Sequence, residues 1–218
     1  KTAYEIRNCD WSSDVCSSDL ISVTARHMMP ALGLTDQQMG FVFSSFVIGY
    51  ALFQIPGGRL GDRWGARLIL TIALVWWSVF TAWTALAPVS FLTGMAGIVG
   101  ALATVRFLLG VGEAVALPNF NRAVTDWLPA NERGLGIGIA IGGIGVGAAI
   151  TPPITAWIMV NFGWQTAFYL SAVIGLLLAG IWWWLARDRP DEHPWVQGPA
   201  SVDRKSTRLN SSHSSVSR

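Results

Sequence analysis

Residues Phe91 to Leu117 read FLTGMAGIVGALATVRFLLGVGEAVAL, an apolar run long enough to cross a bilayer that holds two charges, Arg106 and Glu113. Such charges cost about 2.5 to 3.5 kcal/mol each at the centre of a membrane helix, so they normally face a cavity, a partner or a substrate. The seven-residue spacing places both on one helix face, about 10 Å apart along the axis. Because we expect this distance to prevent direct neutralisation, Arg106 is predicted to bind an anion from elsewhere. Glu113, if it cannot stay charged there, is a candidate proton carrier.

The composition indicates a membrane protein, since 52% of the 218 residues are hydrophobic and only 13% are charged. A soluble domain carries about twice that charged fraction. The net charge of +2 does not predict nucleic-acid binding, because the arginines fall between apolar runs rather than on one face. Cys9 and Cys16 lie outside every apolar run, so they predict neither a disulfide framework nor a metal site. No catalytic constellation is visible, and we expect neither enzyme activity nor a cofactor.

Five apolar runs approach or exceed the roughly 20 residues that span a bilayer as a helix. They predict membrane helices at about 38–56, 68–88, 91–117, 135–160 and 164–186. The chain is therefore expected to be an all-α, multi-pass membrane protein that contacts the lipid bilayer.

Arginines occur in alternate connections between these runs, at Arg59, Arg63, Arg67, Arg122, Arg133, Arg187 and Arg189. The turns at 88–91 and 161–163 carry no Lys or Arg. By the positive-inside rule, the arginine-bearing connections are predicted to be cytoplasmic. The tryptophans at 182–184 then fit either an aromatic belt at that face or lipid-facing filler.

Both ends of the chain are polar and rich in serine. Residues 1–20 and 199–218 resemble translated sequencing adaptors, and we expect a non-native leader and a non-native, disordered tail. A native disordered tail is the alternative reading of the composition. Residues 21–198 are expected to form the transmembrane part.

A second motif lies between the first two runs and reads Gly58-Arg59-Leu60-Gly61-Asp62-Arg63-Trp64-Gly65-Ala66-Arg67. It resembles the signature loop between helices two and three of the major facilitator superfamily, Gly-x-Leu-x-Asp-Arg-x-Gly-x-Arg. In physical terms, glycines allow a tight turn, arginines hold the loop at the anionic cytoplasmic surface, and Asp62 can cap a helix or pair across the domain. A generic positive-inside loop is the alternative. With Arg122 and Arg133, residues Gly58, Asp62, Arg63, Gly65 and Arg67 form the predicted signature and gating set.

A narrower resemblance comes from three further stretches: Arg106-Phe-Leu-Leu-Gly-Val-Gly-Glu113, Pro118-Asn-Phe-Asn-Arg122 and Glu132-Arg133-Gly134. They are similar to the anion:cation symporter family, which includes bacterial transporters for hexuronate, glucarate, galactarate and galactonate. This resemblance implies proton-coupled uptake of an organic anion by alternating access in the bacterial cytoplasmic membrane. Such carriers have twelve helices in two halves, with the substrate between the halves.

The resemblance also implies that residues 21–198 are an N-terminal half, with five full helices and the last turns of the first at Ile21–Met29. The missing C-terminal half of the same polypeptide is then its partner, and we expect the 218-residue chain alone not to transport. The family's Asp-Arg pair on the first helix has no counterpart here, and leader residues such as Ser17 and Ser18 stand in its place.

Four residues are candidates for transport. Arg106 is predicted to clamp a substrate carboxylate, or alternatively to bond helix carbonyls. Glu113 is predicted to carry the proton, or alternatively to pair with Arg122 or Arg133 near the interface. The resemblance implies that Tyr50 contacts a substrate hydroxyl, with Gln54 as its companion, whereas a backbone hydrogen bond is the alternative for Tyr50.

The fourth apolar run is rich in glycine, including Gly138, Gly142, Gly143 and Gly147. This spacing favours close helix packing over substrate contact. Pro152 and Pro153 are expected to kink the same helix. Two other functions stay open: a facilitator for another carboxylate or an efflux substrate, and a membrane fragment with no transport of its own.

Overall fold

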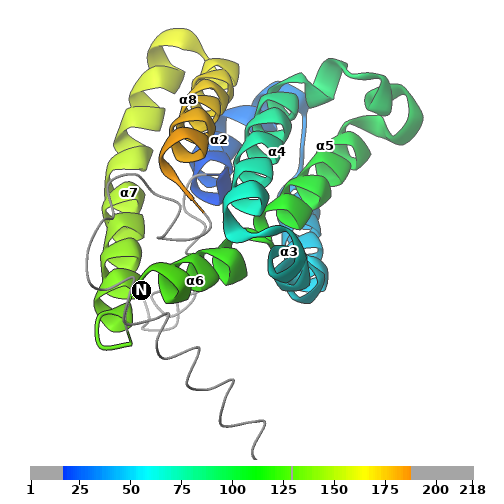
Figure 1. Ribbon diagram of the computed structural model, residues 1–218. Coiled ribbons are helices and arrows are strands. Elements are labelled where there is room, and N and C mark those ends of the chain that lie inside the picture. Colours follow the sequence, from blue (N-terminus) through cyan, green and yellow to red (C-terminus); the bar gives the residue numbers. More distant parts are fainter. Residues whose placement is uncertain (1–16, 129, 188–218) are drawn as a thin grey trace, which may run out of the picture.

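The computed structural model describes residues 17–128 and 130–187, which are helical and contain no strand within these ranges (Figure 1). This confirms the predicted all-α class. The elements are α2 (Ser17–Leu32), α3 (Asp36–Trp64), α4 (Ala66–Leu86), the 3-10 turn η1 (Ala87–Val89), α5 (Phe91–Glu113), α6 (Ala116–Trp127), α7 (Arg133–Phe162) and α8 (Trp164–Leu185). Five helical segments in this part of the chain are long and apolar enough to cross a membrane.

Local sequence signals fix several helix ends. Thr35 caps α3 with a capping box, in which its hydroxyl accepts from the backbone N–H of Gln38 and the Gln38 side chain accepts from the backbone N–H of Thr35. Gly65 separates α3 from α4 with φ 86°, and Gly163 separates α7 from α8 with φ 87°. Glycine adopts such backbone angles without strain. One glycine is therefore enough to reverse the chain direction between α3 and α4, and another between α7 and α8.

Three helix boundaries differ from the sequence prediction. α3 continues past the predicted end near residue 56 to Trp64, so most of the signature motif is helical and only Gly65 forms the turn. The run 91–117 is bent at Gly97, where φ is 71°, and it stops at Glu113 before α6 begins at Ala116. α2 begins at Ser17, four residues before the expected start of the native part, and Leu20 on it is buried.

The closest helix packing joins α3 to α5 and α6. Gly49 faces Phe107, Gly57 faces Val115, and Gly61 faces Asn119, each so closely that a Cβ on the glycine would overlap the partner. The three pairs keep the same separation along the sequence, so the helices run parallel in a constant register. Small residues allow such close backbone approach, which drives helix association where lipid removes the hydrophobic force.

The core forms where α2, α3, α5 and α8 meet. Its fully buried side chains include Met28, Val42, Leu102, Val105, Leu109 and Phe168. α7 lies apart at one side (Figure 1) and buries only Thr155, Ile158 and Met159 among its described residues. Nothing in the described chain lies within 4 Å of a Cβ built at Gly138, Gly142 or Gly143, so the packing role predicted for these glycines stays a prediction.

We predict that Gly110→Ala destabilises the bundle, because the new Cβ would overlap the carbonyl oxygen of Phe46 on α3. Overpacking of this kind costs about 1 to 3 kcal/mol. Thermal unfolding of the purified chain in detergent should show a lower midpoint. Gly138→Ala is the matched control, because its Cβ meets open space, and its midpoint should be unchanged or higher. Equal midpoints for the two variants would contradict the close α3–α5 contact.

Candidate functional site

The two membrane charges lie on α5 inside the bundle. Arg106 is in its second half and Glu113 is its last residue, and each is only 1% exposed. The expectation that the two charges do not neutralise each other directly stays a prediction. In a medium of low dielectric constant, charges interact over longer distances than in water, so each partly compensates the other.

The contacts of Arg122 and Arg133 bear on the alternative reading of Glu113. Arg122 bonds the carboxylates of Asp62 and Asp126, and Arg133 donates to the carbonyls of Thr125 and Leu128. Neither set includes Glu113. Both interfacial arginines are therefore engaged by other groups, and the partner of Glu113 stays a prediction.

Tyr50 and Gln54 lie on α3 at the same depth as the charged pair. The glycine pairs set a constant register between α3 and α5. In this register Arg106 lies just before Tyr50 and Glu113 lies just after Gln54. Gly110, between the two charges, packs directly against the backbone of Phe46 and Tyr50. The Gln54 amide donates to the Tyr50 hydroxyl at 3.3 Å. The four predicted transport residues therefore lie along one stretch of the α3–α5 pair, and their roles stay predictions.

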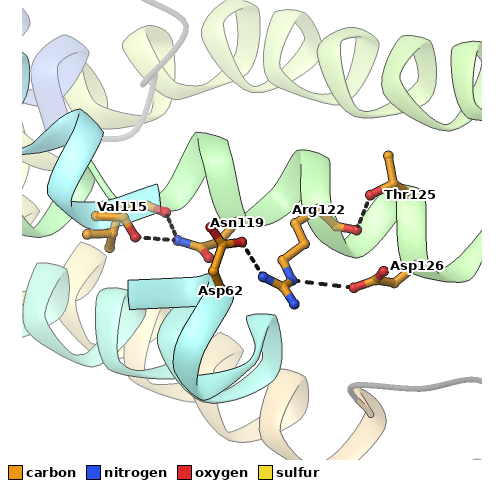
Figure 2. Close-up of polar contacts among 7 residues, drawn as sticks. Asp62, Val115, Asn119, Arg122, Thr125 and Asp126 are labelled. Atoms are coloured by element: carbon orange, nitrogen blue, oxygen red, sulfur yellow. Dashed lines mark hydrogen bonds and ion pairs between the residues drawn. The ribbon is translucent and has the colours of Figure 1, made fainter. Parts of the chain in front are cut away.

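The signature motif and α6 meet at one end of the bundle (Figure 2). Asp62, near the end of α3, accepts from Arg122 on α6, and Arg122 also lies 3.5 Å from the Asp126 carboxylate. The side chains of Arg122 and Asp62 are 34% and 73% exposed. Gly58 lies against Pro118 at the start of α6. Asp62 therefore pairs across the domain, which was one of its two expected roles.

Arg67 ties the start of α4 to the end of α8. Its Nη2 donates to the carbonyl oxygen of Trp183 at 2.7 Å, and its guanidinium lies 4.1 Å from the centre of that indole ring. Trp182 donates from Nε1 to the carbonyl oxygen of Arg67 at 3.3 Å. These contacts bring Trp182 and Trp183 to the arginine-bearing end, where the predicted aromatic belt would lie. Arg63, by contrast, is exposed at the same end.

Asn119 is a polar residue that the sequence did not single out. It lies on α6, is 1% exposed, and donates from Nδ2 to the carbonyl oxygens of Gly57 at 3.2 Å and Val115 at 2.6 Å (Figure 2). The available signal was its spacing, since Asn119 and Arg122 are three residues apart and share a helix face. Its partner, the carbonyl of Gly57, could not be recognised from the sequence, because only the fold brings residues 57 and 119 together.

Two apolar cavities lie away from the charged pair. One of about 640 Å³ is bounded by α4, α6, α7 and α8, and one of about 280 Å³ by α4, α7 and α8. Leu74 and Leu178 line both cavities. Neither cavity is lined by Arg106, Glu113, Tyr50 or Gln54, so the four predicted residues do not enclose either cavity.

Comparison with known proteins places this arrangement in a family. The family model described as Major Facilitator Superfamily matches residues 14–212. The chain belongs to the major facilitator superfamily. Transporters of this superfamily are not enzymes, in agreement with the sequence prediction, and the chain is a multi-pass membrane protein with five membrane-length helices among its described residues.

The similar curated proteins are transporters of small anions. A hexuronate transporter of Bacillus subtilis (strain 168) is 38% identical over 172 residues, which cover 79% of this chain and 39% of the relative. A D-galactonate transporter of Escherichia coli O6:H1 is 36% identical and covers 74% and 36%. A probable sulfoacetate transporter of Cupriavidus necator is 38% identical and covers 81% and 39%. The predicted resemblance to sugar-acid transporters is confirmed, and the chain spans about two fifths of these relatives' length.

Solved structures show the same fold. A bacterial homolog of the human lysosomal transporter Spinster, inward-facing and occupied, superposes with a TM-score of 0.69 at 24% identity, over 85% of this chain and 43% of that one. A proton:xylose symporter bound to 6-bromo-6-deoxy-D-glucose gives a TM-score of 0.69 at 20% identity, over 82% and 42%. At these identities the likeness concerns the fold alone.

We predict that the exposed Asp62–Arg122 pair contributes little to stability. A double-mutant cycle with Asp62→Asn and Arg122→Gln should give a coupling energy below about 1 kcal/mol that falls with added salt, because water and salt screen exposed charges. Thermal or denaturant unfolding in detergent provides the four stabilities. A coupling of several kcal/mol that is insensitive to salt would contradict this expectation.

Proposed function

We propose that the protein of which this chain forms part imports a sugar acid together with protons across the bacterial cytoplasmic membrane by alternating access. The observation that carries the proposal is the buried pair Arg106 and Glu113 at the depth of Tyr50 and Gln54. Two opposite charges of 1% exposure are costly inside a membrane bundle, and transport is the use that this family makes of such residues. The sugar-acid specificities in the relatives' names support the substrate class.

Arg106 binds the substrate carboxylate in this proposal. Its guanidinium is permanently charged and offers a planar fork of N–H donors that matches both oxygens of a carboxylate. Tyr50 and Gln54, which already bond each other, supply hydroxyl and amide groups for the polyol part of the substrate. The opposite wall of the site comes from the other half of the carrier.

Glu113 couples the proton to the anion through the same arginine. Before the substrate binds, the Glu113 carboxylate and the Arg106 guanidinium are opposite charges buried on one helix. A substrate carboxylate that binds Arg106 competes for that positive charge and adds a second negative charge nearby. Glu113 then takes up a proton, since two anions and one cation in a low-dielectric site cost more than one ion pair. Anion and proton therefore load together and leave together after reorientation.

We predict that Glu113→Gln removes proton-driven uptake and keeps anion exchange. In a full-length carrier containing this half, reconstituted in vesicles, accumulation driven by an imposed proton gradient should fall about tenfold or more, because the glutamine cannot release a proton. Counterflow exchange of the same anion should persist. Glu132→Gln, at an exposed position, is the matched control and should transport normally. Proton-driven accumulation at the wild-type level would rule out the coupling role of Glu113.

We predict that Arg106→Lys raises the KM for the anion about tenfold or more. Lysine keeps the positive charge and loses the bidentate fork, and one charge-assisted hydrogen bond contributes about 1.5 to 3 kcal/mol. Initial uptake rates over a range of substrate concentrations would measure the effect. Arg59→Lys, on an exposed part of α3, should leave the KM unchanged. An unchanged KM in Arg106→Lys would assign Arg106 a structural role.

A carrier for another anion is the second candidate. The relative described as a probable sulfoacetate transporter is as similar as the hexuronate transporter, and Arg106 suits any carboxylate. Parallel uptake of glucarate, galactonate, hexuronate, sulfoacetate and an aromatic acid, with and without a proton gradient, separates the two candidates. Preference for a small sulfonate or an aromatic acid, or export in place of uptake, would favour the second.

A further inference from the structure

The bend after Glu113 makes its position depend on α6. α5 ends at Glu113, and α6 begins at Ala116 after a two-residue break and lies across the end of the bundle (Figure 1). The position of a carboxyl group on the last residue of a helix depends on that helix and also on the contacts that fix the segment after it. The contacts that anchor α6 to α3 therefore bear on Glu113.

α6 is anchored to α3 by two polar contacts of different kinds. The Arg122–Asp62 pair lies at the surface, with 34% and 73% of the side chains exposed, where water weakens an ion pair. The Asn119 side chain is 1% exposed. Buried hydrogen bonds resist competition from water, so the amide contact is the stronger candidate for holding α6 in place.

Asn119 contacts a full turn of α3. Its Nδ2 donates to the carbonyl oxygen of Gly57, and its Oδ1 lies where a Cβ of Gly61 would be, packed against the α-carbon of that glycine. No N–H or O–H donor reaches Oδ1 within the described chain. The oxygen therefore occupies space that only a glycine at position 61 leaves open. We call Asn119, Gly57 and Gly61 the amide clasp.

We infer that Asn119 is a positioning residue, which fixes the bend between α5 and α6 through the amide clasp and thereby holds the carboxyl group of Glu113 in place. Asn119 itself touches neither substrate nor proton. The link to proton coupling rests on the proposed function, whereas the clasp stands on the geometry of α3 and α6 alone. Asn119 stands six residues after Glu113, and the clasp anchors the intervening break to the rigid end of α3.

Spin-label distances in the 218-residue chain test the clasp directly. Nitroxides at Gln37 on α3 and Asn121 on α6, both exposed, with Cys9 and Cys16 replaced by serine, report where α6 lies relative to α3. Asn119→Ser keeps the local bond to the Val115 carbonyl and loses the reach to Gly57. Gly61→Ala disrupts the same contact from the other helix. Both should broaden and shift the distance distribution.

Two matched variants control for the loss of an amide or of a glycine. Asn161→Ala removes an amide that donates only to Trp157 on its own helix, and Gly40→Ala adds a Cβ on α3 that meets nothing within 4 Å. Both should keep the wild-type distance distribution.

The infrared band of the Glu113 carboxyl group can be identified by its loss in Glu113→Gln. This band would not shift if the clasp had only a structural role. Infrared spectra of the same samples should show this band shifted in Asn119→Ser and Gly61→Ala and unchanged in the controls. A wild-type distance distribution in Asn119→Ser overturns the inference, and so does a displaced α6 with an unshifted Glu113 band. Neither measurement requires transport, so a failed coupling test with Glu113→Gln would sink the proposed function and leave the clasp standing.

Discussion

The close packing of α3 against the parallel helix α5 and the first turn of α6 is the contact on which the rest of the arrangement depends. Lipid offers no hydrophobic force between helices, so association relies on van der Waals contact and interhelical hydrogen bonds. Gly49, Gly57 and Gly61 bring the backbones together in one register. That register sets which residues of α3 lie level with the charges of α5, and it brings Asn119 and Arg122 to the end of α3.

The buried charges follow from this packing. Arg106 and Glu113 are each 1% exposed, and in a medium of low dielectric constant opposite charges offset part of the cost of removing each other from water. Two buried opposite charges are a weak source of stability but respond strongly to a third charge, because it changes the electrostatic balance between them. Anion binding and proton uptake therefore share one electrostatic cause in the proposed carrier, and no moving part is needed at the moment of coupling.

Much of this could be predicted from the sequence. The length and low charge of the run at 91–117 predicted a membrane helix, and the two charges within it predicted buried ionisable residues. The spacing of Gly58, Asp62, Arg63, Gly65 and Arg67 predicted the superfamily, which the family match confirms. These features are local, so periodicity, charge and spacing suffice to find them.

The features that the sequence missed depend on distant contacts. The motif from Gly58 to Arg67 was predicted to be a loop, yet most of it lies in α3, where Gly57 and Gly61 leave room for Val115 and Asn119. The break after Glu113 and the partner of Asn119 depend on residues about sixty positions away, which no local pattern reveals. How far Arg106 and Glu113 neutralise each other could not be predicted from the sequence, because the dielectric environment is a property of the folded bundle.

Proton movement during uptake tests the central claim most directly. A full-length carrier containing this half would be reconstituted in weakly buffered vesicles, and the external pH would be recorded when hexuronate or galactonate is added. The account predicts an alkaline shift outside that begins with the anion and grows in proportion to its uptake. Anion uptake with no change in external pH would contradict it.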